Sequence, residues 1–353
     1  MVHRRCCETE AETFEKKGDT ILHVMVTGCG GFLGSEIVRQ LLDRGDQVTG
    51  ISRGQYPELV QRGMKHCRGD LTDAKFVNTV IRNADSVVHT AAVAGVWGPW
   101  QHFYSINKLA TDHVLAACRS NQIPQLVFTS SPSVTFDGGH QRGVNESAAY
   151  STRWLCHYPH TKALAEQAVL AAHTPGTLAT LALRPHLIWG EADPHILPRM
   201  LDLARSGRLR IVGDGKNQVD TVHVVNAAAS HLDAIDALST VPEQAGGRAY
   251  FIAQDEPVNC WDWIREICEL GSAPPPTKRI SFSAAYRVGA VLETGYRLTG
   301  RQTEPPMTRF VAAQLARDHY FDIESAKQRL GFRVRLTMNE GLERLHKAWK
   351  EHR

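Results

Sequence analysis

Residues 21–34 read ILHVMVTGCGGFLG, a short apolar run followed at once by a cluster of glycines. Apolar side chains then recur at helical spacing over Phe32–Leu42, so the stretch predicts a strand, a tight turn and a helix. Gly28, Gly31 and Gly34 stand three residues apart across that turn. The first glycine allows the bend, the second lets the backbone approach a pyrophosphate, and the third lets helix and strand pack closely. We therefore interpret the turn as a dinucleotide-binding site at the N-terminus of a helix.

The same alternation of strand and helix repeats along the first half of the chain. Further strands are expected at Gln47–Ile51, Met64–Cys67, Ala84–His89, Gln125–Thr129 and Thr177–Leu183. Helical patterns lie between them at Asp73–Arg82, Gln101–Ser120 and His157–His173. This alternation predicts an α/β fold of the Rossmann type, a doubly wound parallel sheet covered by helices on both faces.

The pattern changes after about Gly190, which divides the chain into three expected parts. Residues 1–20 form a polar N-terminal extension, residues 21–190 an NAD(P)-binding Rossmann domain, and residues 191–353 a smaller substrate-binding lobe interleaved with the end of the sheet. Helices in the lobe are expected at Pro194–Ser206, Trp261–Leu270 and Met338–Lys350. Strands in the lobe are expected at Leu209–Val212, Val219–Val224 and Ala249–Ile252.

Composition narrows the class of protein. The formal net charge is only +3 in 353 residues and no long block of like charges occurs, so no nucleic-acid partner is expected. The eight cysteines form no CxxC pair and suit neither a metal site nor a disulfide framework, so free thiols are expected. No apolar run is long enough to span a bilayer, and residues 1–20 lack the apolar core of a secretory signal. We expect a cytoplasmic protein without a spanning membrane segment.

The end of the second strand bears on the choice between NAD(H) and NADP(H). An NAD enzyme usually offers an acidic residue there to the ribose 2′-hydroxyl, whereas this chain has Ser52 and Arg53. A guanidinium suits a phosphate, so NADP(H) is favoured, although Arg53 could also be a solvated loop residue. Asp70 could accept a hydrogen bond from the adenine amino group, or it could cap the next helix. Further residues expected at the cofactor site are Phe32, Leu33 and Leu71.

Tyr158 and Lys162 stand four residues apart on an expected helix, so they share one face. A phenol with a pKa near ~10 is a poor acid or base at neutral pH, but a nearby ammonium lowers that pKa. Tyr158 could then exchange a proton with a carbonyl or an alcohol, while Lys162 could also reach the nicotinamide ribose. Such a pair also suits a solvated helix face, but its place after the glycine turn favours catalysis.

Serines follow the fifth expected strand, where strand ends in a doubly wound sheet face the ligand crevice. Ser131 is our choice to hold the substrate oxygen beside the tyrosine. Its alternative role is an ST-turn at the strand end, and Ser130 and Ser133 are candidates for lesser roles.

With the glycine turn, the serines and the Tyr158/Lys162 pair in this order, the chain from about Ile21 to about Lys350 resembles the extended short-chain dehydrogenases/reductases. Within them it is similar to the 3β-hydroxysteroid dehydrogenase branch, on the segments 128–134 (FTSSPSV), 183–190 (LRPHLIWG) and 213–217 (GDGKN). It looks closest to the 2-alkyl-3-oxoalkanoate reductases of bacterial olefin biosynthesis, on 52–59 (SRGQYPEL), 94–98 (AGVWG) and 304–310 (EPPMTRF). The sterol-4-carboxylate 3-dehydrogenases are similar at 184–186 (RPH) and 215–220 (GKNQVD), but usually carry the acidic residue that this chain lacks.

The resemblance implies an NAD(P)-dependent oxidoreductase acting on a CH–OH group. We expect it to interconvert a 3-oxo and a 3-hydroxy group on a long apolar substrate, in first place a 2-alkyl-3-oxoalkanoate. The alternative is a 3β-hydroxysteroid or sterol-4-carboxylate 3-dehydrogenase, and an alternative of another class is a non-catalytic NADP(H) sensor. By the family pattern, Ala91 and Ala92 would line the cofactor cleft, Asn107 would support the active site, and Pro185 and Leu187 would back the nicotinamide.

Other expectations concern the substrate and the partners. His186 stands where the olefin-pathway relatives often have arginine, which weakens the case for carboxylate binding there, although a protonated histidine could serve. Pro159 suits the first turn of a helix, so the catalytic helix is expected to begin at about His157. Packing on the core is the preferred interpretation of the amphipathic run Ser281–Leu292, which could also cover a lipid-like substrate or touch a membrane surface. By resemblance, a homodimer is expected. Four aromatic side chains could form the wall of an apolar pocket or could be buried in the interior. They are Trp97, Trp100, Phe103 and Tyr104.

Overall fold

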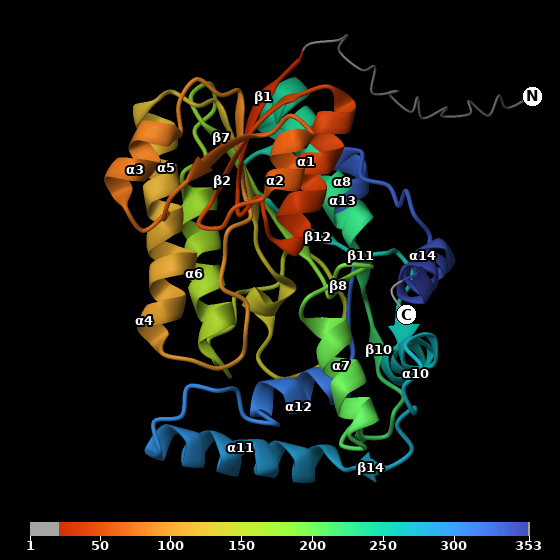
Figure 1. The fold of residues 1–353 in the computed structure, drawn as a ribbon. Coiled ribbons are helices and arrows are strands. Elements are labelled where there is room, and N and C mark those ends of the chain that lie inside the picture. Colours follow the sequence, from red (N-terminus) through yellow and green to blue (C-terminus); the bar gives the residue numbers. More distant parts are fainter. Residues whose placement is uncertain (1–20, 352–353) are drawn as a thin grey trace, which may run out of the picture.

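A computed structural model describes residues 21–351 (Figure 1). The predictions for residues 1–20, with Cys6 and Cys7, lie outside the described residues. The centre is a seven-stranded parallel sheet with the strand order β12-β7-β5-β4-β1-β2-β3, which confirms the predicted doubly wound α/β fold. Its strands are β1 (His23–Thr27), β2 (Gln47–Ser52), β3 (Lys65–Arg68), β4 (Ser86–His89), β5 (Gln125–Thr129), β7 (Ala179–Pro185) and β12 (Ala249–Ile252).

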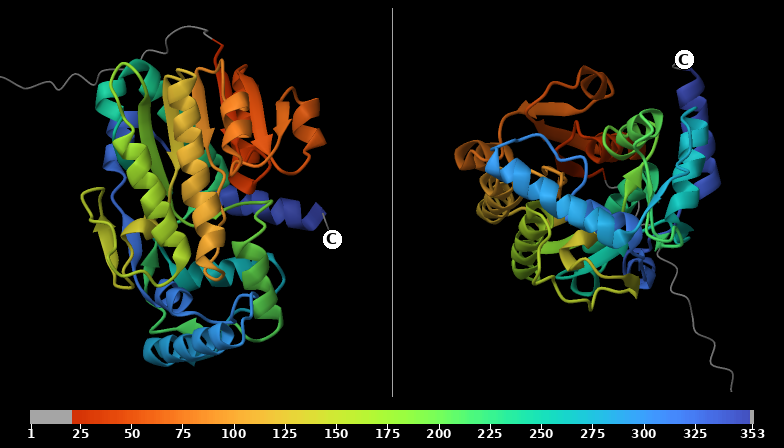
Figure 2. Two further views of the ribbon diagram at one scale, coloured as in Figure 1. Left: turned by 90° about the vertical axis from the view of Figure 1, so that its left-hand side faces the viewer. Right: turned by 90° about the horizontal axis from the view of Figure 1, so that it is seen from below.

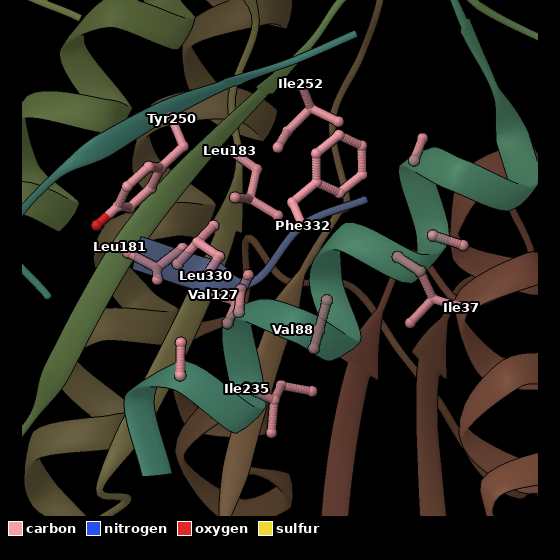
Figure 3. Close-up of a cluster of buried hydrophobic side chains, with 14 of the residues drawn as sticks. Ile37, Val88, Val127, Leu181, Leu183, Ile235, Tyr250, Ile252, Leu330 and Phe332 are labelled. Atoms are coloured by element: carbon pink, nitrogen blue, oxygen red, sulfur yellow. The ribbon is translucent and has the colours of Figure 1, made fainter. Parts of the chain in front are cut away.

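Helices cover both faces of this sheet (Figures 1 and 2). One face carries α3 (Ala74–Val80), α5 (Ala110–Ser120) and α6 (His157–Ala171), and the other carries α1 (Phe32–Arg44), α8 (Val224–Thr240) and α13 (Glu324–Leu330). Because both faces are covered, the strands are nearly continuous apolar runs, which is why they are visible in the sequence. Figure 3 shows the apolar layer on the α8 side, where Ile235 and Ile37 pack with strand residues such as Leu183.

Helix α8 was not predicted. The expected strand Val219–Val224 is wrong in part, because it consists of two short strands, β10 (Gln218–Val219) and β11 (Val222–His223), and α8 begins at Val224. The ring of His223 accepts a hydrogen bond from the Val225 N–H and so caps the helix. Since α8 is alanine-rich and largely buried, it lacks the polar face that marks a surface helix.

The long helix expected at Gln101–Ser120 is interrupted. It is divided into α4 (Trp100–Phe103), a π-helical turn η1 (Tyr104–Leu109) and α5. Such turns are rare and frequently occur at functional sites. Two further helices are short, α2 (Pro57–Gln61) and α9 (Pro242–Ala245). A 3₁₀ turn, η2 (Pro132–Thr135), follows β5.

Most of the remaining elements lie below the carboxyl ends of the strands, and α14 lies at the right-hand flank (Figure 1). The helices among them are α7 (Ile196–Arg205), α10 (Cys260–Leu270), α11 (Phe282–Leu298), α12 (Arg309–Ala316) and α14 (Met338–Glu351). A mixed sheet has the order β13-β10-β15-β6, with β6 (Gln141–Val144), β13 (Val258–Asn259) and β15 (His319–Phe321). Two further pairs join β8 (Ile188–Trp189) to β11 and β9 (Ile211–Val212) to β14 (Arg279–Ile280).

The chain leaves the main sheet after β7 and returns to it with α8 and β12, which pairs with β7 in parallel. The division of the chain near residue 190 stays a prediction. Within residues 21–351, no helix has both the length and the apolar character needed to cross a bilayer.

Candidate active site

The glycine turn after β1 admits no side chain at its two ends. Gly28 has a φ of +68°, and a Cβ there would lie 2.8 Å from the backbone nitrogen of Ala91. A Cβ on Gly34 would lie only 2.1 Å from the carbonyl oxygen of Gly28, so this glycine lets α1 pack against the end of β1. Gly31 is the N-cap of α1, and the first turn carries no acidic residue. The turn therefore brings the backbone and the positive end of a helix dipole close to the cavity, as an anionic pyrophosphate requires.

One large cavity of about 1280 Å³ begins at this turn and runs along the carboxyl ends of the strands. It is lined by every residue that the sequence analysis assigned to the cofactor or to catalysis: Gly28, Gly31, Phe32, Leu33, Gly34, Ser52, Arg53, Asp70, Leu71, Ala91, Ala92, Ser131, Tyr158, Lys162, Pro185 and Leu187. The structure thus brings the predicted residues together, and their individual roles remain predictions.

The end of β2 is basic. The Arg53 side chain is exposed at the rim of the cavity, and Arg68 donates a hydrogen bond of 2.9 Å from Nε to the Arg53 carbonyl oxygen. Two guanidinium-bearing residues therefore meet at the place where an NAD enzyme usually offers an acid. Ser52 is bonded to a neighbour, because its Oγ lies 2.8 Å from His66 Nε2 on β3. Arg68 and His66 were not singled out, since only the pairing of β2 with β3 places them beside Arg53 and Ser52.

Asp70 does not cap the following helix, so that alternative was wrong. Its carboxylate accepts hydrogen bonds from the backbone N–H and the hydroxyl of Thr72, both at 2.9 Å, and Asp73 caps α3 instead. The bond from the Thr72 N–H, with a smaller contribution from Arg53, holds the pKa of Asp70 below its usual range. Tyr56 is a further residue of this region that sequence reasoning missed. Its ring lies against Gly30, where a Cβ would run into it. Tyr56 also lines the cavity, beside the glycine turn.

Tyr158 lies in the first turn of α6, which begins at His157 as predicted, with Cys156 as its N-cap. Opposite it, Ser131 caps the 3₁₀ turn η2, accepting from the Ser133 N–H, and its Oγ lies 2.8 Å from Ser133 Oγ. The ST-turn role is therefore real, and it orients the hydroxyl of Ser131 rather than excluding it from the site. The buried hydroxyl of Ser130, which lines the same cavity, has no hydrogen-bond partner among the described residues.

Lys162 lies one turn further along α6 and is almost fully buried. Its Nζ donates a hydrogen bond of 2.6 Å to the carbonyl oxygen of Thr129 and sits 4.0 Å from the centre of the Phe128 ring. Burial lowers the pKa of Lys162 to about 7, although the charge of Glu166 acts in the opposite direction.

The expected lowering of the tyrosine pKa by the ammonium is not found in the polypeptide alone. Burial raises the pKa of Tyr158 to about 12, and the hydrogen bond with Ser131 offsets this only in part. Tyr158 is therefore a phenol at neutral pH, which is the form that can donate a proton to a carbonyl oxygen.

Asn107 lies in the π-helical turn η1 and connects two walls of the site. Its side chain bonds to both backbone groups of Val93, at 2.8 and 3.1 Å, and donates to Thr161 Oγ1 at 3.0 Å. Thr161 Oγ1 in turn donates to the carbonyl oxygen of Tyr158 at 3.0 Å. Asn107 thus fixes the loop after β4 against the helix turn that carries the tyrosine. The supporting role implied by the family pattern stays a prediction.

A buried ion pair holds α6 against β7. Arg184 donates to both oxygens of Glu166, at 3.0 and 2.5 Å, and Tyr150 donates its hydroxyl to the same carboxylate at 2.7 Å. Burial raises the pKa of Tyr150 well above its usual range, and the Glu166 charge adds to the rise. This network could not be predicted from the sequence, since its three members come from separate parts of the chain.

His186 is not positioned as an isolated cation. Its Nε2 lies 2.6 Å from Nδ1 of His319 on β15, and both rings line the cavity. Burial lowers the pKa of His186 well below its usual range, and the neighbouring His319 adds to this. The description of His186 as a protonated histidine is therefore wrong for the polypeptide alone.

The aromatic residues after β4 do not wall the main cavity. Phe103 is buried, and Trp97 and Phe103 line a second cavity of about 620 Å³ between the start of α6 and α11. Helix α11 closes the lower end of the molecule (Figure 2, right), and Ala285, Val288 and Leu292 on it line the main cavity. It therefore covers the cavity, while Val291 and Leu298 point outward with 71% and 83% of their surface exposed.

The fold, the glycine turn and the Ser131, Tyr158 and Lys162 arrangement define an NAD(P)-binding oxidoreductase of the extended short-chain dehydrogenase/reductase type. A model of the 3-beta hydroxysteroid dehydrogenase/isomerase family matches residues 25–281, and the chain belongs to that family.

Individual relatives agree with this assignment. The 2-alkyl-3-oxoalkanoate reductase of Shewanella oneidensis is 44% identical over 331 residues, which cover 92% of this chain and 86% of the relative. The decarboxylating sterol-4-alpha-carboxylate 3-dehydrogenase of Mus musculus is 32% identical over 90% of this chain and 88% of its own. Among solved structures, MoeE5 in complex with UDP-glucose and NAD is similar with a TM-score of 0.70 and 26% identity, over 94% of this chain and 99% of that one.

Proposed function

We propose that this protein reduces the 3-oxo group of a 2-alkyl-3-oxoalkanoate with NADPH. The observation that carries the proposal is the 44% identity to a 2-alkyl-3-oxoalkanoate reductase over 92% of the chain. The arrangement of Ser131, Tyr158 and Lys162 in one cavity supports it, because these side chains could bind a carbonyl oxygen and supply it with a proton.

In this proposal the cofactor supplies the hydride, and the chain positions both reactants. The glycine turn binds the pyrophosphate, Arg53 binds the ribose 2′-phosphate with Arg68 beside it, and Pro185 and Leu187 back the nicotinamide. Ser131 anchors the substrate oxygen and Tyr158 donates the proton, while Lys162 holds the nicotinamide ribose. NADPH is preferred over NADH because a phosphate needs cations and the end of β2 offers no acid.

The cavity of about 1280 Å³ would hold a lipid-like substrate beside the cofactor. The apolar wall formed by Ala285, Val288 and Leu292 of α11 suits alkyl chains, and the exposed Val291 and Leu298 on the same helix suit peripheral contact with a lipid surface. A homodimer remains the expectation from family resemblance.

A sterol-4-carboxylate 3-dehydrogenase is the second candidate, on the 32% identity to that enzyme. The test supplies purified protein with NADPH or NADH and a 2-alkyl-3-oxoalkanoate, and separately with NADP⁺ or NAD⁺ and a 3β-hydroxysterol, while nicotinamide absorbance is followed. Oxidation of NADPH by the oxo acid is expected. Turnover only with NAD⁺ and the sterol would replace the proposal with the second candidate, and cofactor binding without any turnover would favour the sensor.

A further inference from the structure

Three residues form a hydrogen-bonded chain at the wall of the main cavity. Nε2 of His186 lies 2.6 Å from Nδ1 of His319, and Nε2 of His319 lies 2.7 Å from the carbonyl oxygen of Gln314. A carbonyl oxygen can only accept, so His319 carries its proton on Nε2 and accepts on Nδ1. His186 must then donate from Nε2, which leaves its Nδ1 as the ring nitrogen without a proton.

The Nδ1 atom of His186 keeps some accessible surface. It has no hydrogen-bond partner among the described residues, yet it is not among the fully enclosed polar atoms that lack one. His186 and His319 both line the cavity that contains Tyr158, and the neighbours of His186 in sequence, Pro185 and Leu187, line it as well. Nδ1 of His186 is therefore available to a ligand beside the place proposed for the nicotinamide.

We propose that His186, oriented by His319, binds the carboxyl group of the substrate together with one proton. The inference rests on the proposed function, in which hydride reaches C3 of a 3-oxo acid. The carboxyl carbon is only two bonds from C3, so the group that binds it must lie beside the nicotinamide, as His186 does. Arg199, one of the arginines that line the cavity, is already paired with Glu304 at 2.5 Å.

The tautomers of the two histidines explain why a proton must be bound together with the substrate carboxylate. An imidazole nitrogen without a proton repels a carboxylate, so either the carboxylic acid donates its O–H to Nδ1 or a protonated Nδ1 donates to the carboxylate. Both descriptions contain the same atoms, and one proton from solvent is bound with the substrate anion.

The surroundings keep the histidines neutral until that moment. Burial lowers the pKa of His319 to about 4, and it is opposed by the hydrogen bond to the Gln314 carbonyl and, less strongly, by the charge of Asp318. Asp318 itself is engaged by Arg142 at 2.6 Å and by His140 at 2.9 Å. Proton uptake is thus a consequence of substrate binding and not a state that precedes it.

The test compares a 2-alkyl-3-hydroxyalkanoate with its methyl ester, which are both stable, during oxidation with NADP⁺. The ratio of kcat/KM for acid and ester cancels the pH dependence of the chemical step, which the two substrates share. Between about pH 6 and pH 8 both the free acid and the free histidine are deprotonated, so the ratio should fall about tenfold per pH unit. Since the ester carries no carboxylate, its binding should not be coupled to the uptake of this proton.

Variants separate binding from structure. His186→Gln cannot take up the proton, so the ratio should lose its pH dependence and kcat/KM for the acid should fall about tenfold or more at pH 6. The ester should be oxidised within a few-fold of wild type, and NADP⁺ affinity should be unchanged. His319→Gln should weaken the pH dependence by releasing His186 from its orientation, and the exposed His102→Gln on α4 serves as the matched control.

The outcomes are distinguishable. A ratio independent of pH in wild type, or an unchanged slope in His186→Gln, would overturn the proposal while leaving the reductase function intact. If wild type oxidises neither substrate, the proposed function is wrong and the role of His186 is wrong with it.

Discussion

Lys162 donates a hydrogen bond of 2.6 Å from Nζ to the carbonyl oxygen of Thr129, and so ties helix α6 to the end of β5. Its side chain is only 2% exposed, and burial lowers its pKa to about 7. A single carbonyl and the face of Phe128 replace the water that an ammonium prefers. The protein therefore holds a charge at a costly position, which is typical of sites selected for function rather than for stability.

The first prediction is that Lys162→Met stabilises the fold while inactivating the enzyme. The pKa of Lys162 is about 7 in the folded state and about 10.4 in an unfolded chain. Below pH 7 both states carry the proton and the full cost of burial applies. Between these values only the unfolded chain binds the proton, so the free energy of unfolding of wild type rises with pH.

Removing the charge should abolish that rise and increase the free energy of unfolding at pH 7 by about 1–2 kcal/mol. Denaturant unfolding at several pH values measures both effects, with the exposed Lys65→Met as the control. A variant less stable than wild type at pH 7 would show that the Thr129 hydrogen bond outweighs the cost of burial.

The second prediction concerns proton donation. Tyr158→Phe removes the hydroxyl that we assign to the proton transfer and should lower turnover by about 10²–10⁴-fold. Binding of NADPH, followed by its fluorescence, should be nearly unchanged, because the pyrophosphate and the 2′-phosphate are held elsewhere. Tyr104→Phe, whose ring stacks on Trp100 outside the site, should retain normal turnover. Equal turnover in the two variants would remove Tyr158 from the mechanism.

The third prediction tests the cofactor preference. Arg53→Ala should lower kcat/KM with NADPH by roughly ten- to a hundredfold, since a hydrogen bond to a charged group contributes about 1.5–3 kcal/mol. With NADH the same variant should behave like wild type, because NADH has no 2′-phosphate. Arg62→Ala, which removes a surface ion pair with Asp43, controls for net charge. A similar loss with both cofactors would assign Arg53 to the fold or to the pyrophosphate.

The strands and the cofactor turn could be predicted from the sequence because their signals are local. Buried parallel strands are apolar runs, Gly28 is required by its own positive φ, and Gly34 is required by a contact with Gly28 inside the same turn. The catalytic pair was also accessible, since Tyr158 and Lys162 lie four residues apart on one helix. Every residue predicted to bind the cofactor or to take part in catalysis lines one cavity.

What could not be predicted depends on contacts between distant segments. His186 meets His319 across 133 residues, so a histidine that suggested a lone cation in the sequence is one end of a neutral pair in the structure. Arg68 reaches the cofactor rim only because β3 pairs with β2. The pKa of Tyr158 also escaped prediction, because the balance between burial and the neighbouring ammonium is set by packing rather than by spacing.

The last prediction separates glycines that are required from those that are not. A Cβ on Gly34 would lie 2.1 Å from the Gly28 carbonyl oxygen, which is backbone and cannot move aside without shifting the whole turn. Gly34→Ala should therefore destabilise the fold by about 3 kcal/mol and weaken binding of NADPH and NADH alike, since the pyrophosphate turn is common to both.

Gly295 on α11 is the matched control, because a Cβ there would have no atom within 4 Å. Gly295→Ala should stabilise the fold by about 0.4–1 kcal/mol, through the reduced freedom of the unfolded chain, and leave cofactor affinity unchanged. Thermal unfolding with and without NADPH measures both quantities in one experiment. If Gly34→Ala retained the stabilisation by NADPH seen in wild type, α1 would not need its close approach to β1 for cofactor binding, and the role assigned to the third glycine would be wrong.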